Sequence, residues 1–317
     1  MAEHERDELS PLRDPSDPVF RPLPVPGAGG TAKRFEALWN IARCSPALGR
    51  LAEAHHDAVA ILHEAGRSDV APGLHGVWAA GGPDPLRLLR DGGGWRLRGS
   101  KHWCSGATLA SRALVTAELP NGLGALVLVD LAANGVRPAA PNWESPALRA
   151  VDTRSVHFDL AVDADIIVGV DDWYLRRPGF WHGAVGVAAC WAGCVDGIVG
   201  RLQPRWRADP HAVAHLGAID ALMWSLRTLV AATGDAIDAE PIGEEPVRQQ
   251  RAMRIRHVVA EAVDEIIDRI PRALGPGPLA LDPNVHRHLA ETDLYRRQSQ
   301  AERDLESLGE LSRTIGR

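Results

Sequence analysis

The sequence has few cysteines and no excess of positive charge. Four cysteines in 317 residues are too few to build a secreted disulfide scaffold. Lysine and arginine together number 35 against 41 acidic residues, a net charge of −6. This charge balance does not suggest a protein that binds nucleic acid electrostatically, which normally carries a basic patch. A disulfide-built domain is excluded, and no nucleic-acid partner is expected.

Targeting signals and long apolar runs are also missing. The first ten residues are charged, and no apolar run follows a basic start, so no signal peptide is expected. The longest weakly polar stretch, Phe180 to Val195, is short and interrupted by glycines, so we expect no membrane span. With 45% apolar and 24% charged residues, the composition is that of an ordinary globular protein. We expect a soluble, cytoplasmic protein.

The first part of the chain changes character near residue 30. Residues 1–29 are rich in proline and charge, which predicts a surface arm that is partly disordered. Residues 30–72 carry apolar side chains at helical spacing, with a break at residues 44–46. This pattern predicts a trimmed helical N-terminal domain made of one helical pair.

Residues 73–174 form short runs punctuated by Gly and Pro. Residues 95–98 and 156–160 alternate between apolar and polar side chains, and residues 125–129 are continuously apolar. A hairpin turn is expected at residues 92–94. This pattern of short strands separated by turns predicts a β middle domain, built as an antiparallel sheet or barrel.

Residues 175–317 are helical, with breaks at prolines that cannot continue a helix. The expected helices are Phe180–Leu202, His211–Asp238, Pro246–Leu274 and Pro283–Arg313. Four long helices with short connections predict a bundle. The fold class is therefore α+β multidomain: a short helical N-terminal region, an antiparallel β middle domain and a C-terminal four-helix bundle.

The segment from Trp95 to Ala107 carries the most specific pattern in the chain. A strand is followed by a Gly-Lys pair and a Trp-x-Ser-x-Ala step: Gly99, Lys101, Trp103, Ser105 and Ala107. This segment resembles the middle-domain signature of the acyl-CoA dehydrogenase family. The order of domains agrees with that of the family over about residues 30 to 310, but only the signature in residues 95–107 is specific to the family.

The resemblance implies FAD-dependent α,β-dehydrogenation of an acyl-CoA or acyl-carrier thioester. In that reaction a carboxylate removes the α-proton, and the β-hydrogen leaves as hydride to flavin N5. By similarity, the Trp103 ring shields the flavin face and Ser105 reaches N5. Family members share the cofactor site between subunits, so a homodimer or homotetramer is implied. The acyl chain and the electron acceptor are not identified by the sequence.

The resemblance also implies a glutamate base in the first or the last bundle helix. No acidic residue occurs between Asp172 and Asp196, which leaves His182 as the only titratable candidate in the first of these helices. In the last helix, Glu302 follows Asp293 by close to the family's spacing. Glu302 is therefore the expected base, and a solvated helix face is the alternative for this charged run.

Three departures from the family pattern change the expected cofactor and substrate contacts. The family's Thr-Glu-Pro loop is replaced by residues 77–84, so Trp78 and Ala79 take the flavin-binding place. The Arg-x-x-Phe-Gly motif is missing, and Arg205 is expected to meet the cofactor pyrophosphate. Phe180 and His182 are expected to line the acyl slot.

Two other functions remain open on the same residues. A flavin monooxygenase or oxidase of the same fold would keep Trp103 and Ser105 and would not need Glu302. A cofactor-free partner subunit would have the slot filled by side chains such as Trp78. No metal is expected: Cys190 and Cys194 lie one helical turn apart, but no second ligand pair accompanies them.

Overall fold

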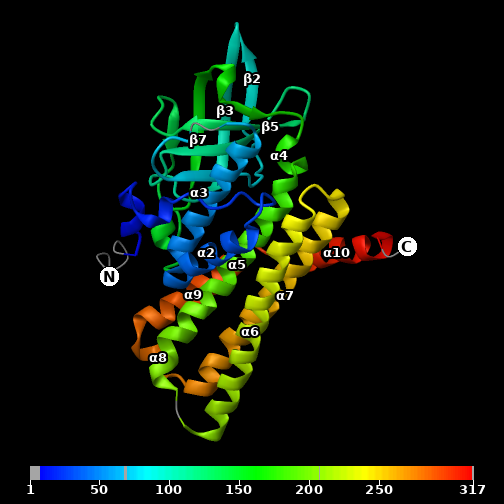
Figure 1. The fold of residues 1–317 in the computed structure, drawn as a ribbon. Helices are drawn as coiled ribbons and strands as arrows, with labels where there is room; N and C mark the ends of the chain where they lie inside the picture. Colours follow the sequence, from blue (N-terminus) through cyan, green and yellow to red (C-terminus); the bar gives the residue numbers. More distant parts are fainter. Residues whose placement is uncertain (1–7, 68–69, 207, 316–317) are drawn as a thin grey trace. The chain divides into compact units, whose positions relative to one another are not determined.

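The structure is a computed structural model that describes residues 8–67, 70–206 and 208–315. The first seven residues of the expected arm lie outside this description; the rest contains the 3₁₀ turns Ser10–Arg13 and Pro18–Phe20. The chain divides into two compact units, which we describe separately. The β unit comprises residues 1–22, 54–145 and 149–180, and the helical unit comprises residues 23–53, 146–148 and 181–317 (Figure 1).

The β unit contains one eight-stranded sheet, mostly antiparallel, as the sequence predicts. The order is β6-β7-β3-β2-β4-β5-β8, and β1 pairs in parallel with β4. The strands are β1 (His75–Trp78), β2 (Arg87–Asp91), β3 (Gly94–Cys104), β4 (Arg112–Glu118), β5 (Gly124–Asp130), β6 (Val136–Pro138), β7 (Arg154–Val162) and β8 (Ile167–Gly169). The expected hairpin turn joins β2 to β3 at Gly92, whose φ of 58° suits glycine.

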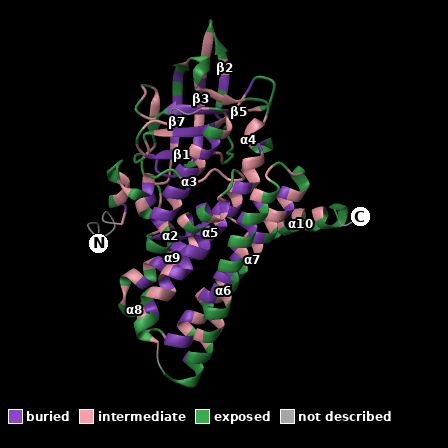
Figure 2. Cartoon of the chain, viewed as in Figure 1, coloured by how far each residue is buried: buried purple, intermediate pink, exposed green. Residues whose placement is uncertain are grey.

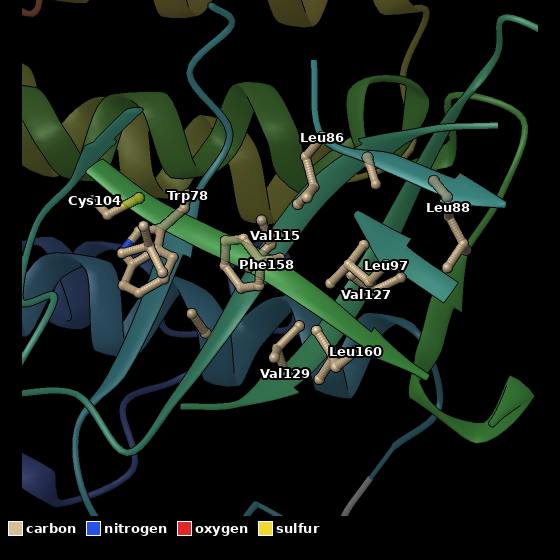
Figure 3. Packing of buried hydrophobic residues seen from close by; sticks show 14 of the residues in the cluster. Trp78, Leu86, Leu88, Leu97, Cys104, Val115, Val127, Val129, Phe158 and Leu160 are labelled. Atoms are coloured by element: carbon tan, nitrogen blue, oxygen red, sulfur yellow. The ribbon is translucent and has the colours of Figure 1, made fainter. Parts of the chain in front are cut away.

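Strands β4 and β5 are buried on both faces. One face contributes Val115, Val127 and Val129 to the main core of the β unit (Figure 3). The other face contributes Leu114, Leu126 and Leu128, which pack against residues 58–62 of α3 (Pro46–Glu64). Burial on both faces explains why the sequence here is continuously apolar and does not alternate.

The helical unit confirms three of the four expected bundle helices. Its long helices are α2 (Thr31–Cys44), α5 (Pro178–Leu202, from residue 181), α6 (Pro210–Ala239), α7 (Glu245–Leu274), α9 (Pro283–Arg296) and α10 (Glu302–Ile315). Short helices are α4 (Trp173–Arg176, in the β unit) and α8 (Gly277–Leu281), and 3₁₀ turns occupy Arg149–Val151, Ala164–Ile166 and Gln203–Arg205.

The single helix expected over Pro283–Arg313 is wrong. The chain leaves the helix after Arg296 and re-enters it at Glu302, and Ala301 between them has a φ of 44°. The backbone N–H of Gln300 donates to the Asp304 carboxylate at 3.0 Å, so a side chain in the first turn of α10 holds the segment that precedes the helix. The sequence has no Pro or Gly at this break, so its helical periodicity predicts one continuous helix.

One helix of the described chain, over residues 178–205, is long and apolar enough to cross a membrane by length and composition. It is longer than the Phe180–Val195 stretch on which the expectation of no membrane span was based. Its most apolar window is 67% buried, as is also found for core helices of soluble proteins.

Glycines on α5 allow α2 to approach at backbone distance. A Cβ on Gly193 would lie 2.2 Å from the carbonyl oxygen of Trp39, and one on Gly197 would lie 2.2 Å from that of Arg43. These distances are far below van der Waals contact. The small residues of α5 are therefore a packing requirement of the helical unit.

A buried carboxylate lies on the same turns of α5. Asp196 is 8% exposed and accepts a hydrogen bond from Trp39 Nε1 at 2.9 Å. It also pairs with Arg43 at 3.0 Å and with Arg227 of α6 at 2.7 Å. Three donors from two helices satisfy this carboxylate, as a buried charge requires.

A second carboxylate fixes the start of α2. Asp238, near the end of α6, accepts hydrogen bonds from the N–H groups of Gly29, Gly30 and Thr31 and from the Thr31 hydroxyl. Burial opposes ionisation, but these hydrogen bonds outweigh it and lower the pKa of Asp238. The carboxylate thus stays charged at the positive end of the helix.

We predict that Gly193→Ala destabilises the protein by about 2 kcal/mol or more, because the added methyl would meet the Trp39 carbonyl. Denaturant unfolding measures this loss. The control is Gly217→Ala on α6, where a Cβ meets nothing within 4 Å. There, stability should stay or rise by up to about 1 kcal/mol. Equal effects at the two positions would contradict the backbone contact.

Candidate functional site

Trp103 lies at the end of β3 and is presented to solvent by an unusual backbone. Its side chain is 65% exposed, and its φ of 59° is left-handed, which costs energy for a non-glycine residue. The register between β3 and β7 shifts between Lys101 and Cys104. The irregularity turns Trp103 outward, and an exposed aromatic held in a strained conformation is typical of a binding site.

A second tryptophan accompanies Trp103. Trp143, from the loop between β6 and β7, lies edge-on to it, with ring centroids 6.3 Å apart and planes at 89°. Together the two rings offer an aromatic surface suited to a planar partner.

Ser105 follows on the same turn and is 9% exposed. Its N–H donates to the carbonyl oxygen of Trp103 at 3.0 Å, and its hydroxyl lies 3.1 Å from that of Thr153. A hydroxyl can donate one hydrogen bond and accept two, so Ser105 Oγ keeps capacity for a further partner. The backbone N–H, by contrast, is already engaged.

Trp78 supports this turn from inside the β unit. Its ring is 2% exposed within the main core (Figure 3), and its Nε1 donates to the carbonyl oxygen of Ser105 at 3.0 Å. The side chain therefore fixes Ser105 from behind. A cofactor contact from this loop would have to come from the backbone around Ala79, and it stays a prediction.

A pocket of about 290 Å³ opens on the residues that precede Trp103. Its wall includes Lys101, which is 7% exposed and donates to Thr116 O at 3.1 Å and Thr116 Oγ1 at 2.6 Å. Burial lowers the pKa of Lys101 to about 8. His102 also lines the pocket, and its Nδ1 lies 2.8 Å from Ser155 Oγ.

The other residues expected at the site have partners in their own units. Phe180, in the β unit, packs edge-on against Tyr174 with centroids 5.4 Å apart. His182, in the helical unit, is 2% exposed, and its Nε2 lies 2.9 Å from the carbonyl oxygen of Pro241. That contact gives His182 a packing role. Substrate binding by either residue stays a prediction.

Arg205 and Glu302 both belong to the helical unit. The Arg205 guanidinium pairs with Asp282 at 2.5 Å, so its charge is already matched by a carboxylate. Glu302 is exposed in the first turn of α10, a helix with no buried residue (Figure 2). The roles of pyrophosphate ligand and catalytic base stay predictions.

Within the residues that the structure describes, no group of three or more His, Cys, Asp or Glu side chains could hold a metal ion. Cys190 and Cys194 are both fully buried in α5. Burial raises the pKa of each thiol, which keeps both in the neutral form.

No family model and no curated protein matches this chain. Several solved structures match it. KijD3 in complex with FMN and a dTDP-linked amino keto sugar has a TM-score of 0.82 and 18% identity, over 99% of this chain and 89% of KijD3. The chain has the acyl-CoA dehydrogenase fold.

Two further structures share the acyl-CoA dehydrogenase fold with this chain. TdsC from Paenibacillus sp. A11-2, in complex with FMN and indole, has a TM-score of 0.79 and 16% identity, over 100% of this chain and 90% of TdsC. A nitrososynthase from Micromonospora carbonacea var. africana has a TM-score of 0.75 and 20% identity, over 90% of this chain and 82% of its own. At these identities the similarity establishes the fold.

Sequence reasoning missed Trp143 and Thr153, which contact the two motif residues. Both lie in or beside the segment between β6 and β7, where no periodicity or motif singles them out. Their role follows only from the pairing of β7 with β3, which brings these distant residues to the Trp103 turn.

We predict that Trp103→Gly is more stable than Trp103→Ala by about 1 kcal/mol, because glycine adopts a positive φ without strain. The matched pair is Trp224→Gly and Trp224→Ala on α6, where the side chain is 69% exposed. In that ordinary helix the alanine variant should be the more stable by about 1 kcal/mol. Thermal or denaturant unfolding checks this reversal of sign, and the same order at both positions would refute a strained Trp103.

Proposed function

We propose that this protein is a flavin-dependent oxidoreductase that binds FMN against the Trp103 turn of its β unit. The observation that carries the proposal is the exposed Trp103, held in a strained conformation beside the Ser105 hydroxyl. Strained backbone conformations of this kind cluster at ligand-binding sites, where the strain is part of the function. When bound, the flavin supplies the redox chemistry that these side chains lack.

The residues of the turn have distinct tasks in this proposal. Trp103 and Trp143 hold the planar ring system by aromatic contact. Ser105 Oγ, placed by Thr153, hydrogen-bonds a polar edge of the ring. Trp78 holds Ser105 in position through its carbonyl oxygen, which is a positioning role.

The support for FMN over the FAD expected from the sequence has two parts. KijD3 and TdsC, which share the fold, are complexed with FMN. In this chain, the arginine expected to bind the FAD pyrophosphate is engaged: Arg205 pairs with Asp282, which also caps α9. FMN has no pyrophosphate and needs no such arginine.

For the reaction, we favour oxygen-dependent oxidation, one of the alternatives that the sequence leaves open. TdsC is a dibenzothiophene monooxygenase, and a nitrososynthase shares the fold. Glu302 is exposed on α10, a helix with no buried residue. Acyl-thioester dehydrogenation is the second candidate, favoured by the signature over residues 95–107.

We propose that the protein forms a homo-oligomer, which is what the resemblance to the acyl-CoA dehydrogenase family implies. Most of α5 from residue 185 to 198 is buried inside the helical unit, whereas α10 has no buried residue (Figure 2). Helix α10 therefore offers an uncovered surface for contact with a second subunit.

The purified protein should show visible flavin bands or acquire them with added FMN, and the released flavin should be FMN. Trp103→Ala should raise the FMN dissociation constant about tenfold or more, since it removes the stacking surface. Trp224→Ala, which removes an exposed tryptophan of the helical unit, is the control and should change nothing. A colourless protein that retains no added flavin would overturn the proposal.

The reaction class is tested by anaerobic addition of an acyl-CoA panel to the FMN-loaded protein. We expect no bleaching of the flavin by the wild type, and we expect Glu302→Gln to leave oxygen-dependent reoxidation unchanged. Glu306→Gln, also exposed on α10, is the matched control. Bleaching by an acyl-CoA that Glu302→Gln abolishes and Glu306→Gln preserves would establish dehydrogenation instead.

A further inference from the structure

The pocket beside the Trp103 turn contains an unusual cation. The chain has only two lysines, Lys33 and Lys101. Lys33 is exposed on α2, whereas Lys101 is 7% exposed in the wall of the pocket. The Lys101 ammonium donates two hydrogen bonds to Thr116, which leaves it one donor position.

Lys101 forms no ion pair with a carboxylate in the described part of the chain. Cys104 lies close enough to affect the pKa of Lys101, but burial raises the pKa of that thiol to about 12, so the sulfur is neutral at ordinary pH. Lysines are almost never buried without a charged partner, because desolvation of the ammonium is not repaid. The structure therefore places a buried positive charge at a pocket wall, with no carboxylate of the described residues paired to it.

Further hydrogen-bond donors surround the same place. His102 Nε2 is buried and has no hydrogen-bond partner among the described residues. The facing loop comes close, since a Cβ on Gly82 would lie 2.5 Å from the His102 ring. No backbone hydrogen bond within the described residues occupies the N–H groups of Gly81 and Gly82. Ammonium, imidazole and peptide N–H groups together suit an oxygen-bearing anion.

The pocket also has an acidic side, which limits the choice of ligand. Asp84, Glu118 and Asp172 line it, and one oxygen of Asp172 accepts the N–H of Gly124 at 2.7 Å. These carboxylates weaken the binding of a simple anion to Lys101. A ligand that also carries hydroxyl or ammonium donors can satisfy them.

We propose that this pocket binds a carboxylate or phosphate group of a small polar ligand, with Lys101 as the counter-ion and with ligand hydroxyl or amino groups facing Glu118 and Asp172. The oxyanion could come from a substrate or from the FMN phosphate, and the chemistry of recognition is the same. The proposal does not depend on flavin binding, because the pocket and Lys101 belong to the flavin-free chain.

The test follows the two lysine side chains by NMR in protein labelled with ¹⁵N at lysine Nζ. The flavin-free protein is titrated with sulfate, acetate or glycerol 3-phosphate, with sodium chloride at matched ionic strength as the control. We expect a saturable shift of the Lys101 signal and a rise in its pKa by about one unit or more. Lys33 is the internal control and should not move beyond the chloride effect.

Because anion binding and protonation of Lys101 are coupled, sulfate binding should weaken about tenfold or more between pH 7 and pH 9.5, where Lys101 loses its proton. The other titratable side chains that line the pocket are Asp84, Glu118, Asp172 and His102. A Lys101 signal that moves only as much as Lys33, or equally in chloride, would overturn the proposal.

Variants separate binding from folding and identify the source of the oxyanion. Lys101→Met should abolish sulfate binding, and Lys33→Met should preserve it; circular dichroism checks that both fold. If Lys101→Met does not fold, the wild-type titration still decides. A Lys101 shift caused by FMN but not by riboflavin assigns the site to the cofactor phosphate. A shift caused by glycerol 3-phosphate in FMN-saturated protein assigns it to a substrate.

Discussion

The helical unit depends on one buried carboxylate, Asp196. Its Oδ2 atom receives donors from α2 and α6. The approach of α2 requires Gly193 and Gly197 on α5, because a Cβ at either position would meet a carbonyl oxygen of α2. The glycines permit the close approach of α2 to α5, and the hydrogen bond and ion pair to the Asp196 carboxylate stabilise it. Through this contact the N-terminal helix α2 folds as part of the C-terminal bundle, although most of the chain lies between them in sequence.

The parts of the fold that could be predicted from sequence are those marked by local chemistry. Prolines ended α5, α6 and α7 near the expected residues, and Gly92 marked the β2–β3 turn. The break between α9 and α10 was not foreseen, because it is marked only by a left-handed alanine and by a hydrogen bond from Gln300 to the Asp304 carboxylate in an otherwise helical pattern. Such a break is fixed by the final structure and leaves no composition signal.

The residues of the candidate site also differ in how far they could be predicted from the sequence. Trp103 and Ser105 could be found because they stand in one short motif, where residue types and spacing suffice. The partners of the more distant residues could not: Arg205 meets Asp282 and His182 meets the Pro241 carbonyl through tertiary contacts. The unpaired state of Lys101 was equally hidden, since burial and the lack of a counter-ion are properties of the folded pocket.

The burial of β4 and β5 on both faces has a consequence for how this architecture can be reused. Leu114, Leu126 and Leu128 are covered by the second half of α3, while the first half of the same helix belongs to the helical unit. The β sheet is thus not an autonomous module. A gene fragment that begins at its first strand would expose an apolar face, so recombination or excision has to carry residues 54–64 along with the strands.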